Sequence, residues 1–324
     1  MKITKLKIEK IKIPNLKKLD LSKLKPVLSF FKSRLLRVFV VYLLVLLAIT
    51  EFVFGVLIYG FKMENKTTTF VSKIIPYPIA VANQDFVTNK DYLKEKDYIH
   101  HFYAATQQSD LDYTSIDSEI LNQLVENKLI GFQAMRYKVK VNKADVDTSV
   151  NQIIDQNGGP DKVNKALDEL YGLTLDQFKD LVKTQLLREK IGSDLIMKVK
   201  AQHILILVDK EATAEKIAEA KTKIDGIKKE IDGGLDFSEA AKKYSEDVGS
   251  AEQGGNLDPF ARGEMVAEFS DVAFKTAVGT VSDPVKTEFG WHIIKVESRT
   301  GKIDKSFNDW LEAIKKKSLI LRFI

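Results

Sequence analysis

The 324-residue chain contains no cysteine, which excludes disulfide bonds, thiolate nucleophiles and zinc–thiolate centres. Histidine is scarce: there are four, and the adjacent His100 and His101 would point in different directions on a helix. A histidine metal cluster is therefore not expected, and we predict neither a metal nor a cofactor. Without disulfides the protein depends on its hydrophobic cores, and a hydrophobic content of 44% is enough to build them.

A net positive charge is absent from most of the chain, although the chain as a whole carries +5. Residues 1–37 hold 12 of the 50 Lys and Arg residues but only 2 of the 45 acidic ones, so the remainder has 38 basic and 43 acidic side chains. A nucleic-acid-binding body would carry clustered Lys and Arg on its own folded surface. The charge distribution therefore argues against nucleic acid as a partner and indicates a membrane-topology signal.

One hydrophobic run is long enough to cross a membrane. Residues 38–61 contain 17 Leu, Ile, Val or Phe residues and one ionisable side chain, Glu51. As a helix this run would extend about 36 Å, against a hydrocarbon core of roughly 30 Å. Burying the acid costs on the order of 3 kcal/mol, which the apolar residues outweigh several-fold. Glu51 is more simply a protonated or helix-pairing residue than a functional intramembrane carboxylate.

The run differs from a cleaved signal peptide in its length, its 37-residue basic leader and the absence of a small-residue cleavage motif after it. We therefore predict a retained, single-pass anchor in the plasma (inner) membrane. The excess of Lys and Arg before it, including Arg34 and Arg37, places the N-terminus in the cytoplasm and the later domains outside. The lipid bilayer is thus a predicted partner, and the basic tail either binds an anionic leaflet or is simply solvated.

Helix signals dominate residues 85–198, after a polar and β-branched segment that predicts a short stalk and an extended stretch. Thr174 and Gln177 have the spacing of a capping box, and Thr88 and Asn142 are further N-cap residues. Gly172 stands where a helix would end in a left-handed backbone. These signals predict an all-helical domain.

Four motifs follow one another between residues 201 and 296, where strand and helix patterns alternate. They are Gln-His-Ile-Leu at 202–205, Tyr-Ser-Glu-Asp at 244–247, Gly-Gly-Asn-Leu at 254–257 and Phe-Gly-Trp-His-Ile-Ile at 289–294. In this order they resemble the parvulin-type, or PpiC-class, peptidyl-prolyl cis-trans isomerases. The resemblance implies an α+β fold with an FKBP-like antiparallel sheet and surrounding helices.

The resemblance also implies a site without nucleophile, metal or redox group. Its polar side would comprise the catalytic residues His203, Asp247 and His292. Its apolar side would be a proline pocket, with Thr287 as a weaker candidate for orienting the histidines; the pocket residues are Leu257, Met265 and Phe269, with Phe260 and Phe289 at the edge. The histidine pair is alternatively a buried brace between two strands, and the apolar residues are alternatively plain core.

Two stretches of the helical segment, residues 120–130 and 172–178, resemble the N-terminal chaperone domain of the extracytoplasmic foldases SurA, PrsA and PpiD. In that family a C-terminal helix returns to complete the chaperone domain, so the amphipathic segment at 307–314 is expected to pack there. The alternative is that Trp310 packs locally on the isomerase unit.

Together these observations predict a membrane-anchored extracytoplasmic prolyl isomerase and foldase whose partners are unfolded or folding exported polypeptides with X-Pro bonds. The competing hypotheses are a holdase chaperone with an inactive parvulin-like unit and a membrane-assembly scaffold. The oligomeric state is left open. The predicted parts are a cytoplasmic tail (1–37), a transmembrane helix (38–61), a helical chaperone domain with a stalk (62–199), an isomerase domain (200–299) and a C-terminal helix (300–324).

Overall fold

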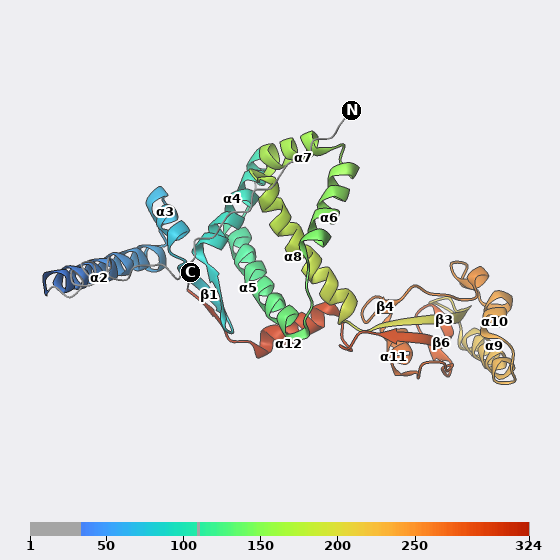
Figure 1. Cartoon of the computed structure of the whole chain (residues 1–324). Coiled ribbons are helices and arrows are strands. Elements are labelled where there is room, and N and C mark those ends of the chain that lie inside the picture. Colours follow the sequence, from blue (N-terminus) through green and yellow to red (C-terminus); the bar gives the residue numbers. More distant parts are fainter. Residues whose placement is uncertain (1–33, 109–110, 324) are drawn as a thin grey trace, which may run out of the picture. The chain divides into compact units, whose positions relative to one another are not determined.

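The computed structural model of the chain describes residues 34–108 and 111–323 (Figure 1). The chain forms two compact units, Met1–Ile75 and Pro76–Ile324, each of which is described by itself. The prediction for the basic tail concerns residues that lie mostly outside the described ones. The fold is α+β, mostly helical with antiparallel sheets, as predicted.

The first unit contains an apolar helix, α2 (Arg34–Gly55), which a π-helical turn extends over Val56–Gly60. Its segment Val38–Gly60 has a mean hydropathy of 2.6 and is long and apolar enough to cross a membrane. The predicted irregular stalk is wrong in one respect, because α3 (Lys66–Ile74) follows. The Asn65 side chain accepts hydrogen bonds from the first turn of α3, and this cap outweighs the weak helix propensity of its β-branched residues.

The helical part of the second unit follows the capping signals of the sequence. Asn142 and Thr174 form capping boxes, Thr88 caps a helix through the backbone N–H of Asp91, and Gly172 ends one with a φ of +62°. The helices are α4 (Asn89–Ala105), α5 (Tyr113–Tyr137), α6 (Lys143–Gln156), α7 (Pro160–Ala166), which continues as a π-helical turn over Leu167–Tyr171, and α8 (Leu175–Asp194).

A small sheet corrects the prediction that this region is all-helical. Strand β1 (Pro78–Ala82) lies between β2 (Asp85–Thr88) and β7 (Ile320–Arg322), and both pairings are antiparallel. The turn at Asn83, which has a φ of +58°, joins β1 to β2. The C-terminal strand thus lies beside a strand near the start of the unit (Figure 1).

Helix α12 (Phe307–Lys317) precedes β7 and packs on the helical region. Trp310 and Leu311 are buried in one cluster with Ile130 of α5 and Ile191 of α8. Lys315 Nζ also lies 3.0 Å from Glu126 Oε1 of α5. Helix α12 therefore packs on the helical region. The cluster also contains Ala261, a buried residue of strand β4 (Phe260–Ala261) in a second sheet.

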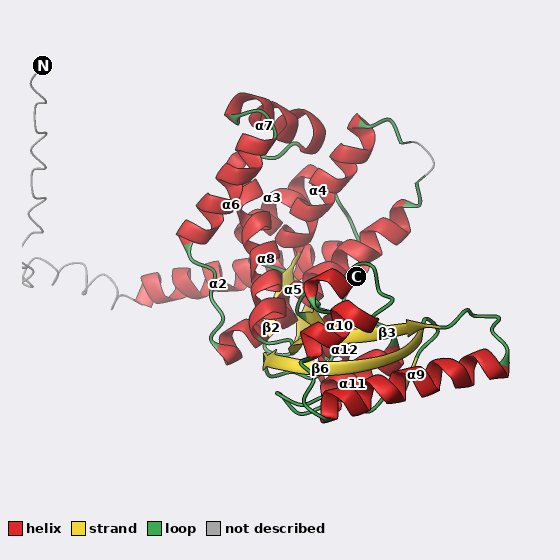
Figure 2. Ribbon diagram, turned by 90° about the vertical axis from the view of Figure 1, so that its right-hand side faces the viewer, coloured by secondary structure: helices red, strands yellow, loops and turns green. Residues whose placement is uncertain are grey.

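The second sheet has the order β4-β3-β6-β5, with all neighbours antiparallel. Figure 2 shows its two long strands side by side. The elements of this part are β3 (Lys198–Leu207), α9 (Ala214–Asp232), α10 (Phe237–Tyr244), β4 (Phe260–Ala261), α11 (Ala267–Lys275), β5 (Val285–Lys286) and β6 (Gly290–Thr300).

Alternation along β3 and β6 gives the sheet two covered faces. Ile204 and Ile293 point to one face and pack with residues of α9 and α10. Ala201 and Ile294 point to the other face and pack with Phe269 and other residues of α11. His203 is two residues from Ala201 on β3, and His292 is two residues from Ile294 on β6. Both imidazoles therefore lie on the face covered by α11.

Candidate active site

The register of β3 and β6 brings the two predicted histidines together. His203 is opposite Ile294, and His292 is opposite Leu205, so the two histidines are diagonal neighbours on one face. Their ring centroids are 5.6 Å apart, the rings are inclined by 18°, and the two Nδ1 atoms are 3.4 Å apart. Both residues are buried, with 7% and 4% of their surface exposed.

Asp247 reaches the same site from the loop after α10. Its Oδ2 lies 2.8 Å from His203 Nε2, so the three predicted polar residues form one contiguous group. Ser250 belongs to this group as well: its Oγ is 3.0 Å from His203 Nε2, and its hydroxyl donates to Asp247 Oδ2 in a short hydrogen bond. Thr287 completes the group at the far end, with its Oγ1 2.8 Å from His292 Nε2.

The acidic end of this group sets the direction of its hydrogen bonds. A carboxylate only accepts, so His203 Nε2–H donates to Asp247, and the Nδ1 of the neutral ring is an acceptor. His292 then donates from Nδ1 to His203, and its own Nε2 accepts from the Thr287 hydroxyl. The backbone N–H of Phe289 donates to Thr287 Oγ1 at 3.1 Å. Every polar side chain of the chain of hydrogen bonds is satisfied.

The pKa values of two groups favour this arrangement. Burial and, to a smaller extent, the neighbouring His203 lower the pKa of His292 to about 4, against an opposing effect of Asp247. For Asp247, burial opposes ionisation, but hydrogen bonds from Ser250, His203 and the backbone of Gly249 together hold its pKa below the ordinary value. At neutral pH His292 is therefore uncharged and Asp247 is ionised.

The apolar side of the site centres on Phe269 of α11. Its ring meets both imidazoles edge to face, at centroid distances of 5.7 Å to His203 and 5.3 Å to His292. Leu257 and Met265, which are half-buried, pack against the same cluster. The structure thus brings three of the predicted pocket residues to the histidine face of the sheet.

Two predicted edge residues have different surroundings. Phe260 is 2% exposed and packs between Phe269 and Phe274, with centroid distances of 5.9 and 6.1 Å, as an ordinary core residue would. Phe289, by contrast, is 52% exposed. Phe289 is therefore the one with a side chain open to an incoming molecule.

The Gly-Gly motif fixes the loop that borders the site. Gly255 has a φ of +76°, and its carbonyl accepts a hydrogen bond from the His203 backbone N–H at 2.8 Å. A Cβ on Gly255 would lie 2.1 Å from the His203 carbonyl oxygen. Only glycine allows this loop to lie directly against β3, where it holds the backbone of His203 and places Leu257 next to it.

Ser250 is the residue that sequence reasoning missed. It is 4% exposed and links the carboxylate to the imidazole, yet nothing in its immediate sequence distinguishes it from a loop serine. Its spacing of three residues from Asp247, within a turn in which its N–H donates to the Asp247 carbonyl, was the available signal.

Among the described residues, no group of three His, Asp or Glu side chains is placed to hold a metal ion. Ser250 lies within hydrogen-bonding distance of His203, but its hydroxyl donates to Asp247 and the facing Nε2 of His203 carries a proton, so the imidazole is not arranged as a base for this serine. The chemistry of the site is that of a rigid, satisfied polar wall beside apolar side chains.

Comparisons with known proteins agree with this description. The profile of the PPIC-type PPIASE domain matches residues 181–300, and that of the SurA-like N-terminal domain matches residues 27–192. The foldase protein PrsA of Geobacillus sp. (strain WCH70) is 36% identical over 219 residues, which cover 61% of this chain and 69% of that protein. The foldase protein PrsA of Exiguobacterium sibiricum is 35% identical over 223 residues, or 64% of this chain and 68% of that protein.

Among solved structures, peptidylprolyl isomerase (PrsA) from Bacillus anthracis is 33% identical to this chain. The match covers 61% of this chain and 86% of that one. The TM-score is 0.28, so the superposition supports no conclusion about the arrangement of the parts.

Proposed function

The chain belongs to the PrsA-type foldases, which join a SurA-like N-terminal domain to a PPIC-type domain; it is an extracytoplasmic foldase and peptidyl-prolyl isomerase, and from this premise we propose where and how it acts. The site is the histidine face of the β3–β6 sheet. The observation that carries this proposal is the contact of Phe269 with both members of the hydrogen-bonded pair His203 and His292.

The reaction makes few chemical demands on such a site. The barrier to rotation about a peptide bond, about 18–20 kcal/mol, comes from amide resonance, so neither proton abstraction nor a covalent intermediate is needed. The enzyme must favour the twisted amide over both planar forms. Each tenfold gain in rate requires about 1.4 kcal/mol of such preferential stabilisation.

In the proposed arrangement the proline ring of the substrate packs on the apolar side, against Leu257, Met265 and Phe269. Phe289, with its exposed ring, contacts the substrate at the edge. Fixing the ring leaves the amide to rotate in surroundings that are drier than water, where a twisted amide with less charge separation is favoured over the planar forms. Phe260 supports Phe269 from behind and contacts no substrate.

The imidazoles and Asp247 supply a wall of fixed shape. Because each member of the chain of hydrogen bonds is satisfied by the next, the rings do not need substrate to hold them in place. The ionised Asp247 keeps His203 in one tautomer and adds a fixed negative charge near the amide. We assign it no role as a general base, since the reaction removes no proton.

We further propose that the protein is anchored in the plasma membrane by Val38–Gly60, with the N-terminus in the cytoplasm and the rest outside. The apolar length of this helix and the basic residues of the sequence before it support this topology. Its substrates are then exported polypeptides with X-Pro bonds, whose unaided isomerisation takes tens to hundreds of seconds.

We propose that residues 76–199 and 300–324 form one chaperone domain into which the isomerase, residues 200–299, is inserted, with residues 62–75 preceding it in the sequence as the stalk. The pairing of β1 with β7 and the burial of Trp310 against α5 and α8 support this division. The chain leaves the helical region through β3 and returns to it through α12. In this division the isomerase is therefore an insertion in the chaperone domain.

A cis–trans assay on an X-Pro tetrapeptide tests the site. The full chain in a non-ionic detergent is compared with its His203→Asn, Asp247→Asn and Phe269→Ala variants, and the folded fraction of each is measured by circular dichroism. We expect normal secondary structure and reduced kcat/KM in all three variants. Unchanged kcat/KM in Phe269→Ala would remove the proposed pocket, and suppression of aggregation by an isomerase-dead variant would measure the chaperone activity separately.

A further inference from the structure

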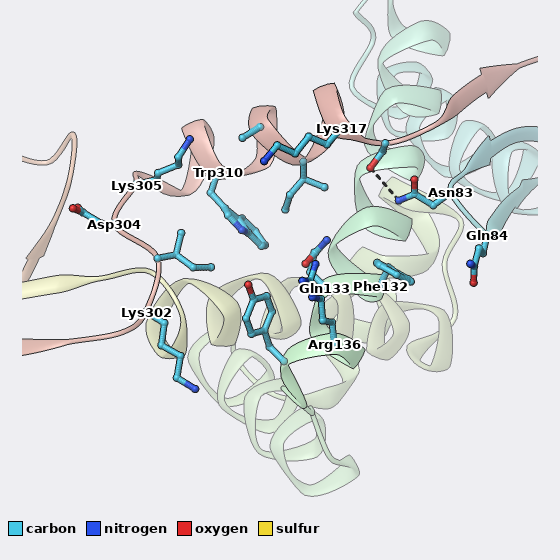
Figure 3. A pocket seen from close by; sticks show the side chains of 15 residues that line it. Asn83, Gln84, Phe132, Gln133, Arg136, Lys302, Asp304, Lys305, Trp310 and Lys317 are labelled. Atoms are coloured by element: carbon cyan, nitrogen blue, oxygen red, sulfur yellow. Dashed lines mark hydrogen bonds between the residues drawn. The ribbon is translucent and has the colours of Figure 1, made fainter.

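A groove of about 680 Å³ lies between α5 and α12, on the helical part of the second unit (Figure 3). Its volume falls within the range of roughly 300–1,000 Å³ that is usual for ligand sites. At one end, the Asn83 side chain donates to the Ser318 hydroxyl at 3.0 Å. At the other end, the segment 302–305 after β6 contributes to the lining. None of the proposed isomerase residues lines it.

The walls of the groove come from two facing helix stripes. On α5, Gln133, Arg136 and Tyr137 recur at three- and four-residue spacing and so share one side of the helix. On α12, Trp310 and Lys317 lie two turns apart on the side that faces them. Figure 3 shows the indole of Trp310 pointing toward α5, with Gln133 and Arg136 on the side of α5 nearer to it. The groove therefore combines aromatic walls with charged side chains.

The charge of the lining is strongly one-sided. Four basic side chains, Arg136, Lys302, Lys305 and Lys317, face one carboxylate, Asp304. Asp304 forms an ion pair with Arg262, which does not line the groove, so its negative charge is already neutralised. Within residues 34–108 and 111–323, none of the four basic side chains forms an ion pair. An anionic ligand would meet positive charge at both ends of the groove.

A buried glutamine supplies a second, independent observation. Gln133 is 8% exposed, and its side-chain amide makes no hydrogen bond to any part of the chain that the structure describes. It lines the groove, where the amide offers both a donor and an acceptor. The buried unpaired side-chain atoms of the described residues are Trp291 Nε1 and Arg299 Nε, so the Gln133 amide is open to the groove, where a ligand that carries both kinds of group would replace its water.

We infer that this groove binds an acidic stretch of polypeptide in an extended conformation, an inference that rests on the proposed foldase function. Side-chain carboxylates pair with the lysines at the two ends and with Arg136. A peptide unit, which has one N–H and one C=O, matches the amide of Gln133. Apolar residues of the same stretch pack on Tyr137, which is 37% exposed. An anionic lipid surface would neutralise the lysines but would leave the aromatic walls and Gln133 unused.

Fluorescence anisotropy of the full chain in a non-ionic detergent tests the inference. The probes are three labelled peptides of one scaffold without proline, in which the charged positions are Glu, Gln or Lys. We expect the Glu peptide to bind about tenfold or more tightly than the Gln peptide, and the Lys peptide to bind weakest. Equal affinity for all three would overturn the inference.

Two variants locate the binding in the groove. Lys302→Glu combined with Lys305→Glu changes exposed side chains, and we expect about a tenfold loss of affinity for the Glu peptide. Gln133→Leu keeps the size of the side chain and removes the amide, and we expect a several-fold loss at unchanged net charge. The matched control, Lys162→Glu with Lys183→Glu, makes the same change of net charge on α7 and α8 and is expected to bind normally.

The remaining outcomes are equally decisive. Equal losses in the control and the groove variants would show a general charge effect and overturn the inference. Binding to phosphatidylglycerol vesicles that the groove variants lose, without binding of the Glu peptide, would assign the groove to lipid. Turnover of the X-Pro tetrapeptide is measured on every protein: its absence throughout would refute the proposed isomerase site and leave the peptide result readable.

Discussion

The isomerase site and the groove between α5 and α12 both set polar side chains against aromatic ones, yet they differ in how those polar groups are satisfied. In the isomerase site, Asp247, His203, His292 and Thr287 form a closed sequence of hydrogen bonds. In the groove, the Gln133 side chain has no hydrogen-bond partner among the described residues. Among the same residues, none of the four basic side chains that line the groove forms an ion pair.

This difference separates two kinds of binding surface. A fully satisfied network is rigid before substrate arrives, which suits a site that must stabilise one distorted geometry. An unsatisfied set of groups gains most from a ligand that completes it, which suits the capture of extended chain. We therefore expect substitutions to act through shape in the isomerase site and through charge in the groove.

The largest effect is expected from Gly255→Ala, which disrupts the isomerase site and leaves the groove unchanged. The added Cβ would lie 2.1 Å from a backbone oxygen of β3, so the loop must move away from His203. We expect a loss of stability of about 4 kcal/mol or more and loss of turnover. Thermal unfolding and the tetrapeptide assay measure both.

Gly279→Ala is the matched control for this substitution. Gly279 has a φ of +83°, but nothing lies within 4 Å of its added Cβ. Only backbone strain remains, and we expect a cost of about 1 kcal/mol with normal turnover. Equal effects of the two substitutions would contradict the importance of the close approach to β3.

The next largest effect is expected from Phe269→Ala, compared with Phe274→Ala on the same helix. Both rings are buried, at 4% and 5% exposure, and belong to one cluster, so both substitutions should cost about 3–5 kcal/mol of stability. Only Phe269 contacts the imidazoles. We expect its kcat/KM, corrected for the folded fraction, to fall about a hundredfold, against less than about threefold for Phe274→Ala. Equal losses of kcat/KM in the two variants would mean that Phe269 acts only as a core residue.

A smaller effect concerns pH. The pKa of His292 is about 4 in the folded protein and 6.5 when unperturbed, so the unfolded state binds the extra proton first as pH falls. Stability from this group is therefore complete above pH 6.5 and is lost progressively toward pH 4. Between about pH 7.5 and about pH 5 the loss should be about 2 kcal/mol.

Urea unfolding of the wild type and His292→Gln at both pH values measures this contribution. The variant lacks the titrating group, so its stability should depend less on pH by about the same 2 kcal/mol. The same pH dependence in both proteins would mean that His292 is not held neutral by its surroundings.

The smallest effect is expected from salt concentration, which should act differently on the groove and on the isomerase site. Raising NaCl from roughly 50 mM to roughly 500 mM should weaken binding of the Glu peptide several-fold, because exposed charges are screened. Turnover of a neutral tetrapeptide should change by less than about twofold, since its site works through buried neutral contacts. Salt-insensitive peptide binding would contradict the role of the lysines.

Local sequence signals predicted much of the second unit. The capping residues Thr88, Asn142 and Thr174 start helices as expected, because an N-cap depends only on residues three or four positions away. The family motifs named His203, Asp247 and His292, which the fold brings into hydrogen-bonding distance; their catalytic roles remain predictions.

Other features required the tertiary structure. Strand β7 is three residues long and pairs with β1, more than two hundred positions earlier, so no local pattern identifies it. Ser250 joins the polar network only because its loop folds over β3. The helix α3 was missed because its β-branched residues suggested an extended chain, while the cap at Asn65 decided otherwise.

The sequence by itself thus determined where most helices begin, which motifs would form the isomerase and that one segment can cross a membrane, because these depend on neighbouring residues or on composition. Only the tertiary structure decided which polar groups find partners. Gln133 and Ser250 look equally ordinary in the sequence, but the first faces a groove and the second a histidine. Hydrogen-bond satisfaction depends on groups brought from distant parts of the chain, and that information is absent from any local stretch.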